Sequence, residues 1–182
     1  MKPTRLGETY PFVEGFPLKG VLSHLREECG GNVHYKGVVN VTASSHNFSE
    51  PCDVTYYGWA GYWGTDNSPD SWICFDFKEK RIELTGYTLR SAPIDPPYFG
   101  PKQWVIEGSN DGSKWHEIDR RNTPDQDGHS VVKTYLCRVD DQAEDFQFIR
   151  LRQTGLNGLG FDILCLSGIE LFGTLFRGSG DS

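Results

Sequence analysis

Residues Trp104–Arg121, with the sequence WVIEGSNDGSKWHEIDRR, decide the fold of this chain. The composition of Asn110–Ser113 is that of a tight turn, because an Asp side chain can bond its own backbone and Gly adopts a positive φ at no steric cost. The residues before the turn alternate between two faces, as in a β-strand, so we predict a β-hairpin. One face of its first strand carries Trp104, Ile106 and Gly108, and the other carries Val105, Glu107 and Ser109.

The strand after the turn departs from regular alternation. Trp115 and Ile118 are three residues apart, so a regular strand cannot direct both of them inward. A β-bulge, in which one strand carries an extra residue, brings such a pair back into step. We therefore predict a bulge or a shifted register between these two positions.

The composition is that of a soluble globular protein. The 182 residues suit one domain that can bury a sizeable core, with 24% charged and 37% hydrophobic residues. A net charge of −7 disfavours a protein that binds phosphate backbones, so nucleic acid is not an expected partner. Aromatic residues at 13%, together with 21 Gly and 10 Pro, favour an all-β fold with many turns.

Membrane and secretion signals are not evident in the sequence. No apolar run is long enough to span a bilayer, and the first fifteen residues lack the apolar core of a signal peptide. The five cysteines have no short spacing, so we interpret them as reduced thiols of a cytoplasmic protein. We therefore interpret the two sequons, at Asn40 and Asn47, as chance occurrences.

The other elements follow from apolar periodicity. A lead-in at residues 1–15 precedes apolar residues at helical spacing from Leu18 to Leu25, and Gly30 suits the end of that short helix. Residues 177–182 have the composition of a disordered tail or linker, so we place the domain at residues 16–176. Besides the hairpin, strands are predicted at 37–43, 71–77, 82–91, 131–137, 146–154 and 164–175.

The chain resembles the discoidin family, also called coagulation factor 5/8 type C domains. The resemblance covers residues 37–175, and it rests on six separated pieces that occur in the family's order. It is strongest to an intracellular branch in which Cys29–His34 and Lys36–Val38 precede the first strand. The resemblance implies an eight-stranded antiparallel jelly-roll sandwich of the galactose-binding-like fold, and a short helix precedes it here. The six pieces are residues 41–45, 62–63, 71–77, 107–112, 148–152 and 169–173.

No catalytic constellation emerges from the sequence. The five histidines are scattered, no Gly-x-Ser-x-Gly motif occurs, and the paired aspartates lie in solvated runs. We expect no enzyme, no cofactor and no metal. Some relatives hold a structural calcium ion. Asp53 and Glu170 are the only candidates for it here, which is too few oxygen ligands for a hard cation.

Family members bind their ligands on loops at one end of the sandwich. Here those loops are 44–70, 91–101 and 155–162. Aromatic rings offer large, rigid contact area with a polar handle, but the same rings can instead fill the open end of the core. We interpret Trp63 and Trp72 as core, while Tyr57, Trp59, Tyr98 and Phe99 fit either reading. The candidate ligand-binding residues are Tyr56, Tyr57, Trp59, Arg90, Tyr98, Phe99 and Leu159.

Two functions fit this surface. The first is a non-catalytic recognition module that binds a protein segment, within a larger intracellular protein and in assemblies of the ubiquitin-ligase type that the resemblance implies. The alternative is a carbohydrate-binding, lectin-like module, because sugars stack on exposed rings and bond to Arg, Asn and Asp. The sequence does not determine the oligomeric state.

Overall fold

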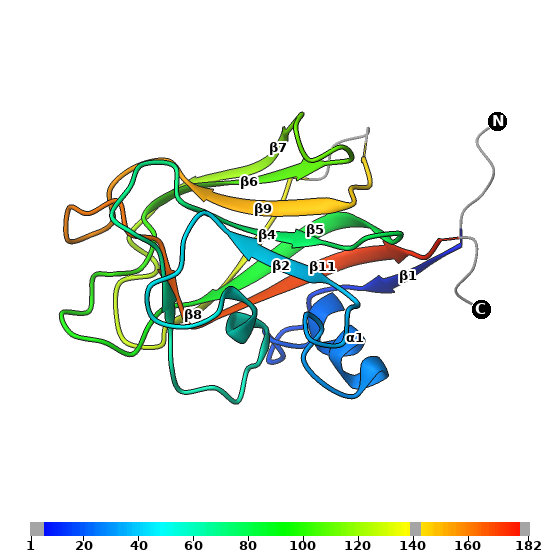
Figure 1. Ribbon diagram of the computed structural model, residues 1–182, viewed down its shortest axis with the longest axis horizontal. Helices are drawn as coiled ribbons and strands as arrows, with labels where there is room; N and C mark the ends of the chain where they lie inside the picture. Colours follow the sequence, from blue (N-terminus) through cyan, green and yellow to red (C-terminus); the bar gives the residue numbers. More distant parts are fainter. Residues whose placement is uncertain (1–5, 139–142, 179–182) are drawn as a thin grey trace.

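A computed structural model describes residues 6–138 and 143–178, and it is a β-sandwich of two antiparallel sheets (Figure 1). One sheet has the strand order β2-β4-β9-β6-β7 and the other has the order β1-β11-β5-β8. The strands are β1 (Gly7–Tyr10), β2 (Asn40–Ala43), β3 (Trp63–Gly64), β4 (Trp72–Asp76), β5 (Arg81–Arg90), β6 (Gln103–Ser109), β7 (His116–Asn122), β8 (Val132–Leu136), β9 (Phe148–Gln153), β10 (Cys165–Leu166) and β11 (Gly168–Phe176). The helices are α1 (Val21–Cys29) and a 3₁₀ turn, η1 (Pro51–Thr55).

The predicted eight-stranded sandwich is confirmed. Eight strands (β2, β4 to β9 and β11) correspond to the predicted segments. Of the other three, β1 extends one sheet, while β3 and β10 pair with each other. The alternating pattern thus identified the framework.

The core lies between the sheets, and its largest side chains come from both layers. Ile73, Phe75 and Phe77 of one predicted face are fully buried, as is Trp104 of the hairpin. Trp63 is also fully buried, which agrees with its interpretation as a core residue. Alternation of this kind buries one face of each strand and leaves the other for solvent or for further packing.

The hairpin carries the predicted bulge. Ile106 pairs with Asp119 and Glu107 pairs with Glu117, so Ile118 is the extra residue on β7. Because of this shift, Ile118 packs against the core while Trp115 lies over the outer sheet face.

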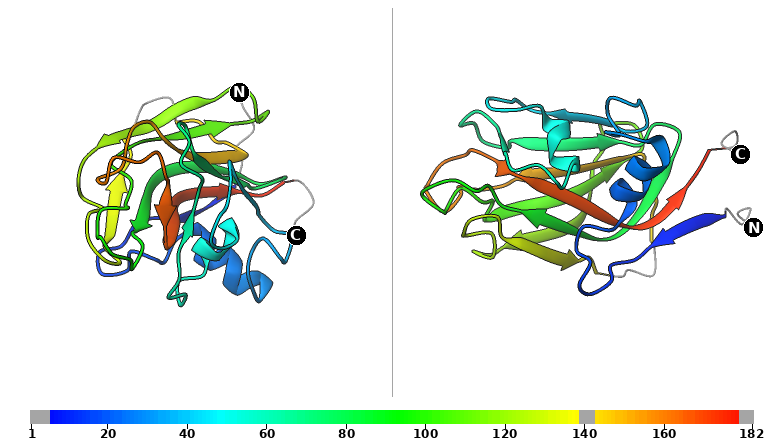
Figure 2. Two further views of the ribbon diagram at one scale, coloured as in Figure 1. Left: turned by 60° about the vertical axis from the view of Figure 1, so that its left-hand side comes forward. Right: turned by 90° about the horizontal axis from the view of Figure 1, so that it is seen from below.

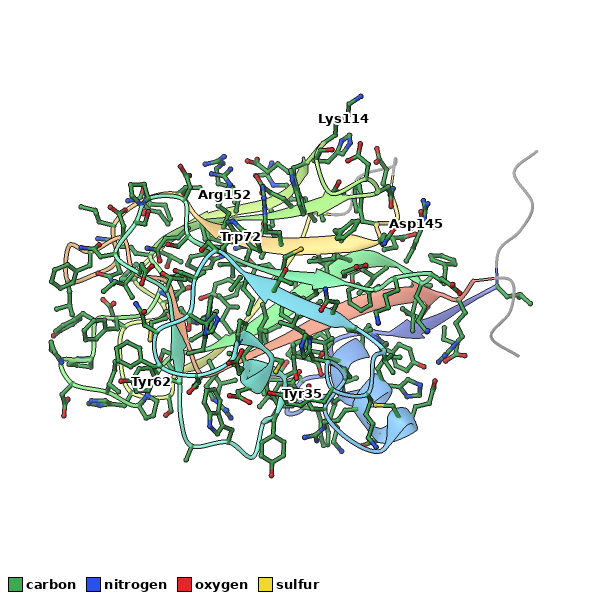
Figure 3. All side chains as sticks on the ribbon, in the orientation of Figure 1. Tyr35, Tyr62, Trp72, Lys114, Asp145 and Arg152 are labelled. Atoms are coloured by element: carbon green, nitrogen blue, oxygen red, sulfur yellow. The ribbon has the colours of Figure 1, made fainter. Side chains whose placement is uncertain are left out.

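The outer face of the five-stranded sheet corrects one expectation. Trp72 is half-buried there instead of lying in the core, and the guanidinium of Arg150 stands 5.9 Å from its ring centroid and 3.8 Å from that of Trp115. Glu107 accepts hydrogen bonds from both Arg150 and Arg152, at 2.7 and 2.8 Å (Figure 3 labels Trp72 and Arg152). Cation–π and charge-assisted contacts therefore cover this face.

Helix α1 packs against β11 and ends where the sequence predicted. Leu22 and Leu25 are buried, and Gly30 adopts φ 73° at the C-terminal cap. Its N-terminus is capped by the distant side chain of Glu170, since Gly20 has none to offer. Among residues 6–138 and 143–178, no helix has the length and apolar character needed to cross a bilayer.

The ordered fold extends beyond the predicted domain bounds. Within the expected lead-in, residues 7–10 form β1 and pair with the end of β11. Arg177, which we expected in the tail, binds the carboxylate of Glu28 through both Nη atoms, at 2.8 and 2.7 Å. Residues 1–5 of the predicted lead-in and residues 179–182 of the predicted tail lie outside the described residues.

Candidate functional site

Three loops gather at one end of the sandwich, which is on the left in Figure 1 and again on the left in the right panel of Figure 2. They are residues 91–101, 123–131 and 155–162, and we call this surface the loop end. The N–H of Gly128 donates to the carbonyl of Pro97 at 2.7 Å, which joins the first two loops. A Cβ at Gly158 would lie 3.0 Å from the carbonyl oxygen of Tyr98 and 3.1 Å from Oδ1 of Asp127, so the third loop touches both of the others.

Asn157 fixes the conformation of the third loop. Its side chain is buried, and its Oδ1 accepts hydrogen bonds from the N–H groups of Leu159 and Phe161 at 3.0 and 3.1 Å. Its Nδ2 donates to the carbonyl of Ile163 at 3.2 Å. An Asn side chain that bonds nearby backbone in this way can hold a loop without regular secondary structure.

The loop end presents apolar side chains to solvent. Tyr98 is 46% exposed, Leu156 48% and Phe161 41%. Phe99 and Leu159 are half-buried on the same two loops. Of the predicted site residues, the structure therefore brings Tyr98, Phe99 and Leu159 together at this end.

A polar pair lies beside these rings. His129 Nε2 and Asp95 Oδ1 are 2.6 Å apart, and both side chains are at least half exposed. The hydroxyl of Ser91 donates to the carbonyl of Gly128 and accepts from the N–H of Val131, which holds the two loops in register. The pair can offer both acceptors and a donor to a hydroxyl-bearing ligand.

The sequence indicated a polar turn at residues 122–130, but we did not expect this loop at the ligand-binding end. A signal was present, because the hairpin returns the chain to the end from which it began, so residue 122 must lie beside residue 103. Pro124 and the Asp127-Gly128 pair then indicate a turn at that same end.

Arg90 serves the fold instead of facing solvent. Its guanidinium donates to the carbonyls of Tyr57 and Trp59 at 2.9 and 3.1 Å, and to the hydroxyl and carbonyl of Ser167 at 2.9 and 3.1 Å. Burial lowers the pKa of Arg90. The predicted site residue Arg90 thus anchors the chain at residues 57–59, and Trp59 packs against the core.

Tyr57 and Tyr56 lie beside helix α1. The hydroxyl of Tyr57 donates to the carbonyl of Ile169 at 2.8 Å, and burial raises its pKa well above the usual value. Tyr56 is 51% exposed, and the guanidinium of Arg26 stands 5.4 Å from its ring centroid. Their packing on α1 separates these two predicted site residues from Tyr98, Phe99 and Leu159 at the loop end.

The rest of the long loop at 44–70 borders the loop end. Asn67 Oδ1 accepts from the N–H of Asp162 at 2.7 Å, which attaches the loop to residues 155–162. Phe48 is 63% exposed, and its ring lies 5.4 Å from that of half-buried Tyr62, which Figure 3 labels.

The candidate calcium residues do not converge. Both carboxylate oxygens of Glu170 are occupied by backbone N–H groups. Within the part of the chain that the structure describes, no group of three or more His, Cys, Asp or Glu residues is placed to hold a metal ion.

No family model and no curated protein matches the chain. Solved structures do match. The module CpGH89CBM32-5 from Clostridium perfringens, in complex with GalNAc-β-1,3-galactose, has a TM-score of 0.58 at 14% identity, over 75% of this chain and 96% of that one. A chitosan-binding module of a chitosanase/glucanase from Paenibacillus sp. IK-5 has a TM-score of 0.57 at 16% identity, over 75% and 96%. The family 32 CBM of NanJ from Clostridium perfringens, in complex with galactose, has a TM-score of 0.56 at 11% identity, over 75% and 94%.

This likeness shows that the fold is galactose-binding-like. It also overturns our first functional hypothesis, that the ligand is a protein segment. The similar structures are carbohydrate-binding modules, which are non-catalytic, and several are described with a bound sugar. They therefore favour the alternative hypothesis, carbohydrate binding.

Proposed function

We propose that the chain is a carbohydrate-binding module that holds a sugar at the loop end. The observation that carries this proposal is the convergence of loops 91–101, 123–131 and 155–162 around exposed Tyr98, with the Asp95–His129 pair beside it. The similar solved structures bind galactose, a GalNAc-galactose disaccharide and chitosan. They support the sugar class, while the loop residues of this chain define its site.

The chemistry of a sugar fits these groups. One face of a pyranose ring carries C–H groups and can pack flat on an aromatic ring such as that of Tyr98. The hydroxyls at its edge both donate and accept, so they can bond to the Asp95 carboxylate and the His129 imidazole. Phe99 and Leu159, half-buried on two of the three loops, extend the apolar contact.

The test is a titration of the purified protein with galactose, N-acetylgalactosamine, fucose and chitosan oligomers, followed by calorimetry and by amide chemical shifts. We expect binding to shift the resonances of residues 95–99 and 127–129. Tyr98→Ala should weaken binding by about 1 kcal/mol, which is roughly fivefold, because the stacking surface is lost. Asp95→Asn should weaken it by a similar factor.

Tyr35→Ala is the matched control, because Tyr35 is 68% exposed and lies between α1 and β2, away from the loop end (Figure 3). Tyr56→Ala tests whether the wider predicted set takes part. A folded protein that binds none of these sugars, or that binds them with Tyr98→Ala as tightly as the wild type, would refute the proposal.

We also propose that the module works in the cytoplasm, as the intracellular branch of the discoidin family would imply. Its five cysteines form no disulfide, and burial raises the pKa of Cys74, Cys137 and Cys165 to about 12. Thiols in this state are inert and need no oxidising compartment. Alkylation of the denatured chain from its own cells should modify all five cysteines, and a disulfide would overturn this part of the proposal.

A further inference from the structure

A cavity of about 380 Å³ opens between the two sheets, in the half of the sandwich away from the loop end. Its walls come from residues 83–85 of β5, residues 116–118 of β7 and, between β8 and β9, residues 137, 138, 143, 144 and 146. Both β5 and β7 reach the loop end only at residues 90 and 122, so the cavity lies near their opposite ends. Its volume is within the range of sites for small organic ligands.

The local packing explains why the sheets part here. On the side toward the loop end they are joined, because the hydroxyl of Tyr87 donates to Asp119 at 2.6 Å and Arg121 donates to the carbonyl of Leu136 at 2.8 Å. Strand β8 ends at Leu136. Beyond it, Phe146 returns to pair with Ile82 through two backbone hydrogen bonds of 2.9 Å, and the space above this pair is the cavity.

The floor of the cavity is apolar. Three buried side chains form it: Leu84, Cys137 and Phe146, which are 8%, 7% and 4% exposed. Ile118, the bulge residue, lines the opposite wall, and the ring of His116 lies 5.7 Å from that of Phe146. A hydrocarbon or aromatic group can therefore be buried against these apolar side chains.

The rim of the cavity is acidic. Among the residues that the structure describes, three carboxylates line it, those of Glu83, Glu117 and Glu144, against one guanidinium, that of Arg138. Glu117 is already paired with Arg120, at 2.6 Å. Among the described residues, Glu83 and Glu144 have no ion pair, so two carboxylates remain for a ligand. Their potential favours a cation at the mouth.

We propose that this cavity is a second binding site, and that it takes a small organic cation with an apolar body, such as an alkyl or aromatic primary amine. The hydrocarbon packs on Leu84, Ile118 and Phe146, while the ammonium group meets Glu83 and Glu144. None of the residues that line the cavity belongs to the loops of the loop end. The site is therefore independent of the one proposed at the loop end.

The test is a titration of the whole chain with n-hexylammonium, n-hexanol and n-hexanoate, with amide and methyl chemical shifts as the readout. We expect hexylammonium to shift resonances of Leu84, Ile118 and Cys137 and to leave Tyr98 and Asp127 unaffected. Hexanol should bind more weakly and hexanoate most weakly. Added salt should weaken hexylammonium binding alone, because only the ammonium contact is electrostatic.

A charge-neutral variant isolates the rim. Glu83→Gln with Glu144→Gln should reduce hexylammonium affinity roughly fivefold and leave hexanol binding unchanged. The matched control is Glu14→Gln with Glu27→Gln, two exposed carboxylates outside the cavity, which makes the same change in net charge. Shifts that are absent from the cavity residues, hexanoate binding as tight as hexylammonium, or equal losses in both double variants would overturn the proposal.

Discussion

Glu170 and Gly20 are 150 residues apart in the sequence, and a carboxylate oxygen of Glu170 accepts a hydrogen bond from the N–H of Gly20 at 3.0 Å. The same side chain accepts from Leu22, Ser23 and Leu171, at 2.9, 3.1 and 2.8 Å. Gly20 has no side chain to cap α1, so β11 supplies the missing acceptor at the positive end of the helix dipole. Burial raises the pKa of Glu170, and the four N–H donors act against that shift.

We expect Glu170→Gln to lower the free energy of unfolding by about 2 kcal/mol, because the amide NH₂ of Gln would face N–H donors that it cannot satisfy. Urea denaturation measures the change. Glu27→Gln, on the exposed side of the same helix, is the control and should change the stability by less than about 0.5 kcal/mol. Equal stability of Glu170→Gln and the wild type would show that the cap is not needed.

Arg90→Lys separates a structural role from a binding role. Lysine keeps the charge but cannot reach both the 57–59 segment and Ser167, so we expect a loss of about 2 kcal/mol in unfolding free energy. Because the Arg90 donors are already occupied, the sugar affinity of the folded variant should change less than about twofold. Calorimetry at a temperature where the variant stays folded makes the comparison. A large loss of affinity with unchanged stability would return Arg90 to the ligand site.

The framework could be predicted because its signals are local. The alternation that ends in Ile73, Phe75 and Phe77 determines which side of β4 faces the core, whatever strand lies next to it. The spacing of Trp115 and Ile118 likewise required a bulge, since a strand cannot turn two residues of odd spacing to one face. Such features depend only on the geometry of a single strand or hairpin.

The partners of long side chains could not be predicted, because they depend on which strands become neighbours. Arg150 reaches Trp72 only because β9 lies between β4 and β6. Tyr57 was an equal candidate for the site and for the core, and its destination at Ile169, 112 residues away, follows from the path of the entire chain. The loop end was predicted only in part for the same reason. Loops 91–101 and 155–162 were expected there, whereas loop 123–131 was not.

Asn157→Ala should disorder the third loop. The substitution leaves the N–H groups of Leu159 and Phe161 and the carbonyl of Ile163 without their side-chain partner, so we expect a loss of about 2 kcal/mol in unfolding free energy. Hydrogen exchange of the Leu159 and Phe161 amides should accelerate as well. Asn122→Ala, at an exposed position of β7, is the control. Unchanged exchange at both amides would show that the loop holds its shape without Asn157.

The hairpin turn should leave a signature at acidic pH. Hydrogen bonds from the N–H groups of Lys114 and Ser113 lower the pKa of Asp111 from 3.8 to about 2. Because the folded-state pKa lies below the unfolded one, the stabilisation by the Asp111 carboxylate is fully present above the unfolded value and disappears as the pH falls to the folded value. The stability advantage of the wild type over Asp111→Asn should therefore shrink across that interval. Urea unfolding as a function of pH measures the difference in stability between the two proteins. NMR titration of the Asp111 carboxyl measures its pKa. Ser113→Ala keeps the backbone donor and should titrate like the wild type, whereas an Asp111 carboxyl that titrates at 3.8 would contradict the assignment.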